Sequence, residues 1–430
     1  MKNNYQMIIS QYLSFILLMV TTLNCLAQEK TFQCTILGTV IDRPYSKELI
    51  LIKDGQDLRV SGIKIPIENN QFKYKLTVKE IETYSLTFDD ELKLGAMKPV
   101  PFFAEADTIH LTLYPMHLFK LNRLEGGTIN QDFVKYQKVQ DEKFEFEQLH
   151  EEAEKLRKEE LFLTEEAYSI YRELDTIKEK ELRDSLMTVY DHLEREERLL
   201  TPAATEIVNL QKKRFGDLII WKMQQIRKQT TIITYTELVS LLKMAQYPSE
   251  SPLPISIPEL ITLYHKNYKP AFPNHPYTQR ADDLIKSMQI IKVGGKYIDF
   301  TAPDFEDNPI QISTKIKGKI ALINLWASWC GPCRQHGKDM IPIYEAYKDK
   351  GFEVVGVARE RKKENAEQAA KMDGYPWINL LELDDNQLIW RKYGIETSGG
   401  GLFLVDTDGT ILAVSPTVEQ VKTILESRLK

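Results

Sequence analysis

The sequence predicts a multidomain protein with a β-rich N-terminal domain, a central α-helical region and a C-terminal α/β domain. Three features support this. Residues 30–120 hold short apolar runs separated by turn residues, and residues 137–200 are dense in Glu, Lys and Leu but lack Gly and Pro. Residues 293–430 alternate strand-like and helix-like segments. A chain of 430 residues is long enough for such a division.

The composition is that of an ordinary soluble protein. Hydrophobic residues make up 43% of the chain and charged residues 27%. The formal net charge of −6 gives no electrostatic basis for binding nucleic acid. We therefore expect no nucleic-acid partner.

Residues 1–27 have the pattern of a cleaved signal peptide. An apolar stretch over residues 12–20 is followed by Cys25-Leu26-Ala27, which offers small residues at the −3 and −1 positions of a cut after Ala27. The alternative is a lipoprotein signal anchored at Cys25, which Asn24 suits poorly because a smaller residue is expected there. The apolar run is too short for a retained membrane span. We expect an exported protein of the periplasm.

Residues 28–122 form the predicted β domain. Turn signals such as Asp54-Gly55 and Asn69-Asn70 divide its apolar runs. Cys34 lies in one of these runs and is interpreted as a small buried apolar residue rather than as an intermolecular disulfide partner. The expected strands include Thr35–Val40, Glu48–Ile52, Gln71–Val78, Thr83–Phe88 and Thr108–Leu113.

Residues 123–291 form the predicted helical region. The composition of residues 137–200 is typical of long helices, and we expect a helical hairpin with smaller helices around it. Thr201-Pro202 suits the cap and first turn of a further helix. Pro248 to Pro258 contains four prolines, which predicts a stiff linker, and two short helices follow it.

Residues 292–430 form the predicted α/β domain. Ile320–Leu325, apart from Asn324, and Val354–Val357 are apolar runs, as expected for strands buried on both faces of a parallel sheet. Leu402–Val405 and Ile411–Val414 are joined through a turn that contains Asp408-Gly409, which predicts a hairpin. Helices are expected near residues 330–350, 362–371, 386–393 and 418–429.

The most informative feature of this domain is a Cys-X-X-Cys pair that follows a buried strand. At the start of a helix, free backbone N–H groups and the positive helix end favour a thiolate at Cys330. Cys333 lies one turn further on, where it can resolve a mixed disulfide. The pair therefore predicts a redox-active dithiol. The motif reads Trp326-Ala327-Ser328-Trp329-Cys330-Gly331-Pro332-Cys333.

The cysteine pair has three alternative interpretations. A structural zinc site needs about four ligands, and no second Cys-X-X-Cys or spaced His pair accompanies this one, although His336 is near. A permanent structural disulfide would close a loop so short that it constrains the unfolded chain little. An inactive relic is the third. The redox interpretation suits the strand–turn–helix context best.

Four short segments of the domain follow one family pattern, namely Ala302–Phe305, Lys317–Lys319, Trp326–Arg334 and Lys350–Val357. They resemble the TlpA/ResA-like thiol–disulfide oxidoreductases, which are exported thioredoxin-fold proteins. The resemblance covers residues 293–430, under a third of the chain. It implies a central sheet with flanking helices, Cys330 as the attacking cysteine and Cys333 as the resolving one.

The same resemblance draws attention to Glu353, where the subfamily carries an acidic residue near the active site. A carboxylate beside a buried dithiol could relay a proton to or from Cys333. Asn324 stands where general thioredoxins carry a buried acid, which favours this role for Glu353. The alternative is an exposed glutamate at a strand edge. A weaker resemblance, through Gly38 and Asn69–Phe72, suggests that the N-terminal domain is a small β-sandwich.

The chain departs from the thioredoxin pattern at the position of the cis-proline opposite the disulfide. Here it has Ser398-Gly399-Gly400-Gly401, with Gly400 nearest to that position. A cis bond is costly without proline, so we expect Gly400 to be trans or in a conformation that only glycine reaches. We also expect a wider, more mobile groove beside the sulfurs. The expected groove residues are Trp329, Gly331, Pro332, Gly399, Gly400 and Gly401.

The sequence therefore predicts an exported thiol–disulfide oxidoreductase that acts on protein disulfides, in the reducing direction by analogy with thioredoxin. No small-molecule cofactor and no metal are expected beyond the redox-active Cys330–Cys333 pair, and a membrane protein is the expected electron donor. A peroxiredoxin is disfavoured because Ile323 and Ala327 replace the Pro and Thr of its motif. The alternative from another class is a binding or scaffold protein that uses the fold as a docking platform.

Overall fold

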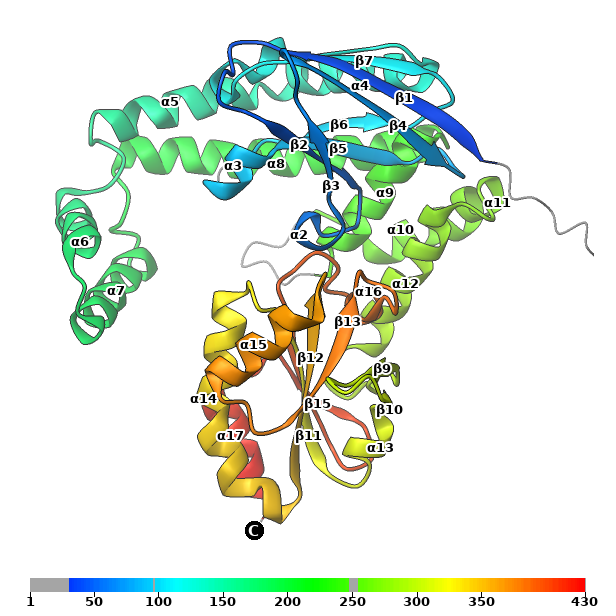
Figure 1. The fold of residues 1–430 in the computed structure, drawn as a ribbon. Helices are drawn as coiled ribbons and strands as arrows, with labels where there is room; N and C mark the ends of the chain where they lie inside the picture. Colours follow the sequence, from blue (N-terminus) through cyan, green and yellow to red (C-terminus); the bar gives the residue numbers. More distant parts are fainter. Residues whose placement is uncertain (1–30, 96, 247–253, 430) are drawn as a thin grey trace, which may run out of the picture.

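The computed structural model describes residues 31–95, 97–246 and 254–429. The predicted signal peptide with Cys25, and the first part of the proline-rich linker, lie outside these residues. In Figure 1, two sheets of the N-terminal part lie at the top, the helical region lies beside and below them, and the α/β part lies at the bottom. None of the helices in the described part is long and apolar enough to cross a bilayer.

The N-terminal part consists of two four-stranded sheets, ordered β4-β1-β7-β8 and β3-β2-β5-β6. β1 pairs antiparallel with β4 and parallel with β7. Buried residues of both sheets form one hydrophobic cluster. The strands are β1 (Phe32–Val40), β2 (Glu48–Lys53), β3 (Ile63–Pro66), β4 (Gln71–Val78), β5 (Thr83–Phe88), β6 (Val100–Phe103), β7 (Thr108–Leu113) and β8 (Arg123–Glu125).

Cys34 belongs to the cluster between these sheets. Its side chain is fully buried and unpaired, and burial raises the pKa of its thiol to about 11. A thiol that stays protonated in an apolar core is inert, so the interpretation of Cys34 as a small apolar residue is confirmed. Short helices accompany the sheets at α2 (Leu58–Ser61), α3 (Asp89–Lys93) and the 3₁₀ helix η1 (Met116–Leu121).

The helical region is more broken than its composition predicted. Residues 137–200 span parts of four helices, because the chain turns at Glu145 and Glu160, which both adopt positive φ angles. The α6–α7 hairpin projects from the body in Figure 1. The first helices are α4 (Thr128–Phe144), α5 (Phe146–Lys158), α6 (Glu165–Thr176), α7 (Lys180–Arg195) and α8 (Pro202–Lys228).

The start of α8 follows its sequence signal. The Thr201 hydroxyl accepts a hydrogen bond from the amide of Ala204 at 3.3 Å, and Pro202 occupies the first turn. The rest of the region packs around a second core that includes Tyr235 and Tyr268. Its elements are α9 (Ile232–Met244), α10 (Ile257–Leu263), the π-helical η2 (Tyr264–Tyr268), α11 (Lys269–Ala271) and α12 (Pro276–Ile290).

The C-terminal part is built on a five-stranded sheet ordered β13-β12-β11-β14-β15. The three strands β11, β12 and β13 are parallel. β14 pairs antiparallel with β11, and β14 and β15 form the predicted antiparallel hairpin. Every residue of β11 is buried, as its apolar run predicts. The strands are β11 (Ile320–Trp326), β12 (Phe352–Glu360), β13 (Ile378–Leu383), β14 (Gly401–Val405) and β15 (Ile411–Val414).

Helices cover both faces of this sheet, with separate apolar clusters on each side. The helix expected near residues 386–393 is shorter than predicted, since only α16 forms there. The remaining elements are β9 (Thr301–Pro303), β10 (Pro309–Gln311), α13 (Ser313–Ile316), α14 (Gly331–Tyr347), the 3₁₀ helix η3 (Lys348–Lys350), α15 (Lys363–Asp373), α16 (Ile389–Lys392) and α17 (Val418–Arg428).

Candidate active site

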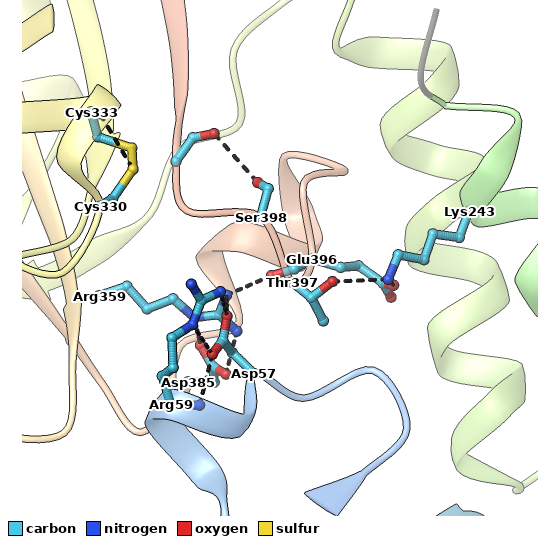
Figure 2. Close-up of polar contacts among 11 residues, drawn as sticks. Asp57, Arg59, Lys243, Cys330, Cys333, Arg359, Asp385, Glu396, Thr397 and Ser398 are labelled. Carbon is cyan, nitrogen blue, oxygen red and sulfur yellow. Dashed lines mark hydrogen bonds and ion pairs between the residues drawn. A yellow bond between two sulfur atoms is a disulfide. The ribbon is translucent and has the colours of Figure 1, made fainter. Parts of the chain in front are cut away.

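The two cysteines lie at the carboxyl end of the central strand, where β11 gives way to α14. Cys330 is the N-cap of α14, and its Sγ accepts a hydrogen bond from the amide of Cys333 at 3.3 Å. The two residues form a disulfide, with their Cα atoms 5.3 Å apart (Figure 2). Because an N-capping sulfur faces unpaired amides and the positive helix end, the reduced Cys330 is set up to be a thiolate.

The disulfide is partly accessible. Cys330 and Cys333 are half-buried, while Gly331 and Pro332 between them are exposed. A substrate sulfur can therefore approach over the turn that links the two cysteines, and Cys333 lies close enough to attack a mixed disulfide at Cys330.

The two tryptophans of the motif have different environments. Trp326 is fully buried, and its Nε1 donates a hydrogen bond to Asn379 Oδ1 at 3.0 Å, so it belongs to the core as expected. Trp329 is half-buried beside Cys330. The guanidinium of Arg59, from the N-terminal part, lies over its ring at 3.6 Å from the centroid. One wall of the site is thus completed by another part of the chain.

The glycine loop, residues 398–401, lies against the sulfurs. A Cβ on Gly399 would stand 2.7 Å from Cys330 Sγ, and a Cβ on Gly400 would stand 2.1 Å from the carbonyl oxygen of Leu325. No peptide bond among the described residues is cis, which includes that of Gly400. The expectation of an open groove is therefore wrong, because the missing side chains let the backbone approach the disulfide closely.

The assignment of Glu353 to the site is also wrong. In the register of the parallel strands, Glu353 pairs with Ala321 at the amino end of the sheet, about 17 Å before Trp326 at its carboxyl end. Its carboxylate accepts a hydrogen bond from Lys319 Nζ at 2.6 Å and is close to solvent. Its side chain is 17% exposed and β12 lies between β11 and β13, so Glu353 also differs from the alternative, an exposed glutamate at a strand edge.

The acid beside the site is Glu360, at the carboxyl end of the same strand. It is 2% exposed, and its Oε1 accepts a hydrogen bond from the backbone amide of Ser328 at 2.6 Å. Ser328 lies two residues before Cys330. The sequence signal for Glu360 was its position at the end of a buried parallel strand, where catalytic side chains of α/β sheets gather.

A second buried acid, Glu382, lies on the neighbouring strand β13. It is fully buried, and the amides of Gln387 and Leu388 donate to its Oε1 at 2.7 and 3.1 Å. Burial, reinforced by the charge of Asp385, raises the pKa of Glu382 to about 7. No sequence pattern pointed to it, because a single glutamate in a strand looks like a solvent-facing residue.

Comparisons with known proteins agree with this geometry. The family model described as AhpC/TSA family matches residues 293–414. Over 140 residues the chain is 28% identical to the thiol-disulfide oxidoreductase ResA of Bacillus thuringiensis. This match covers 33% of this chain and 78% of that protein. A ResA from Geobacillus thermodenitrificans is 29% identical over 143 residues, covering 32% of this chain and 78% of the relative.

Solved structures include the thioredoxin domain of a thiol-disulfide oxidoreductase from Bacteroides vulgatus. It is 28% identical, with a TM-score of 0.30, and the match covers 32% of this chain and 99% of that domain. The C-terminal part of the chain is a thioredoxin-fold domain of the AhpC/TSA kind, homologous to the ResA/TlpA/DsbE-like oxidoreductases.

Proposed function

We propose that the chain is an exported thiol–disulfide oxidoreductase that reduces protein disulfides through Cys330 and Cys333. One observation carries the proposal: Cys330 caps the N-terminus of α14, with Cys333 bonded to it from the first turn of the helix. This arrangement makes one cysteine the better nucleophile and the other its resolving partner.

The reaction runs in two exchange steps. The Cys330 thiolate attacks one sulfur of a substrate disulfide, and the other substrate sulfur leaves as a thiolate. The Cys333 thiolate then attacks Cys330 Sγ and releases the second substrate thiol. Two electrons have passed to the substrate, and the domain is left with the Cys330–Cys333 disulfide seen in the structure.

Glu360 is the proposed proton carrier for these steps. It is buried at the carboxyl end of β12, and its link to the Ser328 amide ties it to the segment that leads into Cys330. A carboxylate in that position can exchange a proton with the thiols as they form and break the disulfide. The groove residues proposed to contact substrate are Trp329, Gly331, Pro332, Gly399, Gly400 and Gly401.

The remaining parts of the proposal concern the setting of the reaction. Regeneration of the dithiol requires a donor of two electrons, for which we propose a membrane-bound thiol protein. No small-molecule cofactor takes part. Export to the periplasm is proposed from the signal-peptide pattern of residues 1–27, and the divisions at residues 28–122, 123–291 and 292–430 are proposed as a β-sandwich domain, a helical domain and the redox domain.

The test is to trap the first intermediate. Full-length Cys333→Ser is expected to form a mixed disulfide with insulin through Cys330, visible as a larger species on a non-reducing gel and lost with thiol. The double variant Cys330→Ser with Cys333→Ser is the matched control. If Cys333→Ser captures no more insulin than the double variant, the dithiol mechanism and the reductase function are both wrong.

A further inference from the structure

The residues just before the glycine loop are held by charged groups from outside the redox domain. Glu396 lies between α16 and β14, three residues before Gly399, and is 2% exposed. Arg280 of α12 donates to both of its carboxylate oxygens, from Nε at 2.7 Å and from Nη2 at 2.9 Å. The Arg280 side chain is 4% exposed, so this bidentate pair is almost fully removed from water.

Two further cations bind the same segment. Lys243 of α9 donates from Nζ to Thr397 Oγ1 at 2.9 Å and lies 3.7 Å from Glu396 Oε2. Arg359 of β12 donates from Nη1 to the backbone carbonyl of Glu396 at 2.6 Å. Figure 2 shows Lys243 reaching this segment from one side and Arg359 from the other.

The N-terminal part joins the same network through two aspartates. Arg280 Nη1 donates to Asp54 Oδ2 at 2.7 Å, so one guanidinium binds Glu396 and Asp54 together. Gly55 follows Asp54 in a turn so close that a Cβ on it would stand 2.7 Å from Arg280 Cζ. Asp57 Oδ2 lies 3.8 Å from Arg359 Nη1. All three parts of the chain therefore converge on Glu396.

The anchored segment leads directly to the disulfide. The Ser398 amide donates to the carbonyl of Ile395 at 2.8 Å, and its hydroxyl donates to the carbonyl of Gly400 at 3.3 Å. Gly399 and Gly400 then place their backbone against Cys330 Sγ and Cys333 Sγ, at spacings that leave no room for a Cβ. Because only three positions separate Glu396 from Gly399, a displacement of Glu396 would also displace the backbone that lies against the sulfurs.

The conformation of Glu396 needs support from outside. Its φ of +24° is unfavourable for a residue other than glycine, and such a backbone persists only where the surroundings fix it. Its buried carboxylate would be strongly disfavoured without Arg280. The strain and the burial together make the position of the glycine loop depend on the cations that bind Glu396.

We propose that Arg280, with Lys243 and Asp54, is a positioning residue of the redox site that holds the glycine loop against the Cys330–Cys333 disulfide. The other parts of the chain thereby set how readily the disulfide is attacked. This inference rests on disulfide exchange at Cys330 as proposed above, but not on the identity of the substrate. Arg280 and Lys243 act through Glu396 and Thr397, and Asp54 acts through Arg280.

Reduction by dithiothreitol tests the proposal without any protein substrate. One thiolate of dithiothreitol attacks the disulfide and displaces one cysteine thiolate. Its second thiolate then attacks the mixed disulfide and displaces the other cysteine, so the products are cyclic oxidised dithiothreitol and two cysteine thiols. In full-length Arg280→Gln, we expect the rate constant to rise about 5-fold, because the loop no longer shields the sulfurs. Asp54→Asn, which leaves the pair with Glu396 intact, should give a rise of about 2-fold.

The matched control is Arg227→Gln. It removes another bidentate Arg–Glu pair of the helical region, Arg227 with Glu259 at 2.5 and 2.8 Å, which is remote from the redox domain. Its rate constant should equal that of the wild type. An unchanged or lower rate in folded Arg280→Gln overturns the proposal. If circular dichroism shows that Arg280→Gln does not fold, the proposal is tested with Asp54→Asn and Lys243→Met. Wild-type rate constants in both of these variants overturn the proposal.

The two proposals can fail separately. A faster reaction of Arg280→Gln with dithiothreitol, in a chain whose wild type captures no insulin, supports the positioning role and contradicts the reductase function. Capture of insulin by Cys333→Ser, together with an unchanged dithiothreitol rate in folded Arg280→Gln, supports the reductase function and contradicts the positioning role of Arg280.

Discussion

Glu360 accepts a hydrogen bond from the backbone amide of Ser328 at 2.6 Å, and this contact joins a buried acid to the segment that carries Cys330. The two residues come from the carboxyl ends of neighbouring parallel strands, β12 and β11. This contact is the basis on which Glu360 is proposed as the proton carrier of the dithiol.

Glu360→Gln should therefore shift the pH dependence of dithiol oxidation. The glutamine amide keeps an oxygen that accepts the hydrogen bond from the Ser328 N–H, but it does not take up or release a proton. We therefore expect the rate constant of dithiol oxidation at neutral pH to fall about 10-fold or more. The measurement is the pH–rate profile of oxidation of the reduced chain by oxidised dithiothreitol. Glu353→Gln on the same strand is the matched control and should follow the wild type, and an unshifted profile in Glu360→Gln would remove Glu360 from the mechanism.

The thiols should differ in reactivity. Because Cys330 caps α14 and Cys333 lies within its first turn, Cys330 should be alkylated first when the reduced chain meets limiting iodoacetamide at neutral pH. Peptide mass spectrometry gives the ratio of the two products, which should favour Cys330 about 10-fold or more. Faster labelling of Cys333 would reverse the assigned roles.

Gly399→Ala should weaken the oxidised state. The new Cβ would stand 2.7 Å from Cys330 Sγ, so the loop or the disulfide must shift. Overpacking of this kind costs about 1–3 kcal/mol, and the oxidised chain should lose stability to urea by that amount. Gly331→Ala is the comparison, since nothing lies within 4 Å of its added Cβ. Equal stability of the two oxidised variants would mean that the loop does not press on the sulfurs.

Glu382 should make the stability of the redox domain depend on pH. Its folded pKa of about 7 lies above the ordinary 4.5, so the folded state binds the proton more tightly than the unfolded state does. The resulting stabilisation is complete below about pH 4.5 and is lost as the pH rises through 7, by on the order of 3 kcal/mol.

Glu382→Gln should remove this pH dependence. Urea unfolding at pH 5 and pH 8, followed by tryptophan fluorescence, measures the difference, because four of the five tryptophans lie in the redox domain. Glu364→Gln, at an exposed position of α15, is the control and should keep the wild-type difference. A pH dependence that survives in Glu382→Gln would mean that another group titrates.

The sequence was most informative where a local pattern decides the structure. A mostly apolar run predicted β11, and the cysteine spacing placed Cys330 at a helix start, which the N-cap geometry confirms. Thr201 was likewise recognised as a cap from its own neighbours. These features need only short-range information, so one sequence suffices.

Features that depend on register or on distant contacts were missed. Glu353 and Glu360 lie on one strand, and only the pairing of β12 with β11 shows which of them is near Cys330. The turns at Glu145 and Glu160 use glutamate at positive φ, which no composition rule predicts. The convergence of Arg280 on Glu396, 116 positions away in sequence, could not be read from either segment alone.

The glycine loop shows how a correct observation can lead to a wrong structure. The sequence shows that proline is absent at Gly400, and from this absence an open groove was predicted. Instead, the missing Cβ atoms let the backbone fill the space beside Cys330. Whether glycine opens or closes a site depends on what holds its neighbours, and here Glu396 does so.

The most direct test of the central claim is the turnover of a disulfide-bonded protein. With dithiothreitol as the electron donor, the wild-type chain should accelerate the reduction of insulin, measured as the rate at which the released B chain precipitates. Cys330→Ser should show only the uncatalysed rate, because no thiolate remains at the helix start to attack the substrate. An equal rate for wild type and Cys330→Ser would contradict the account.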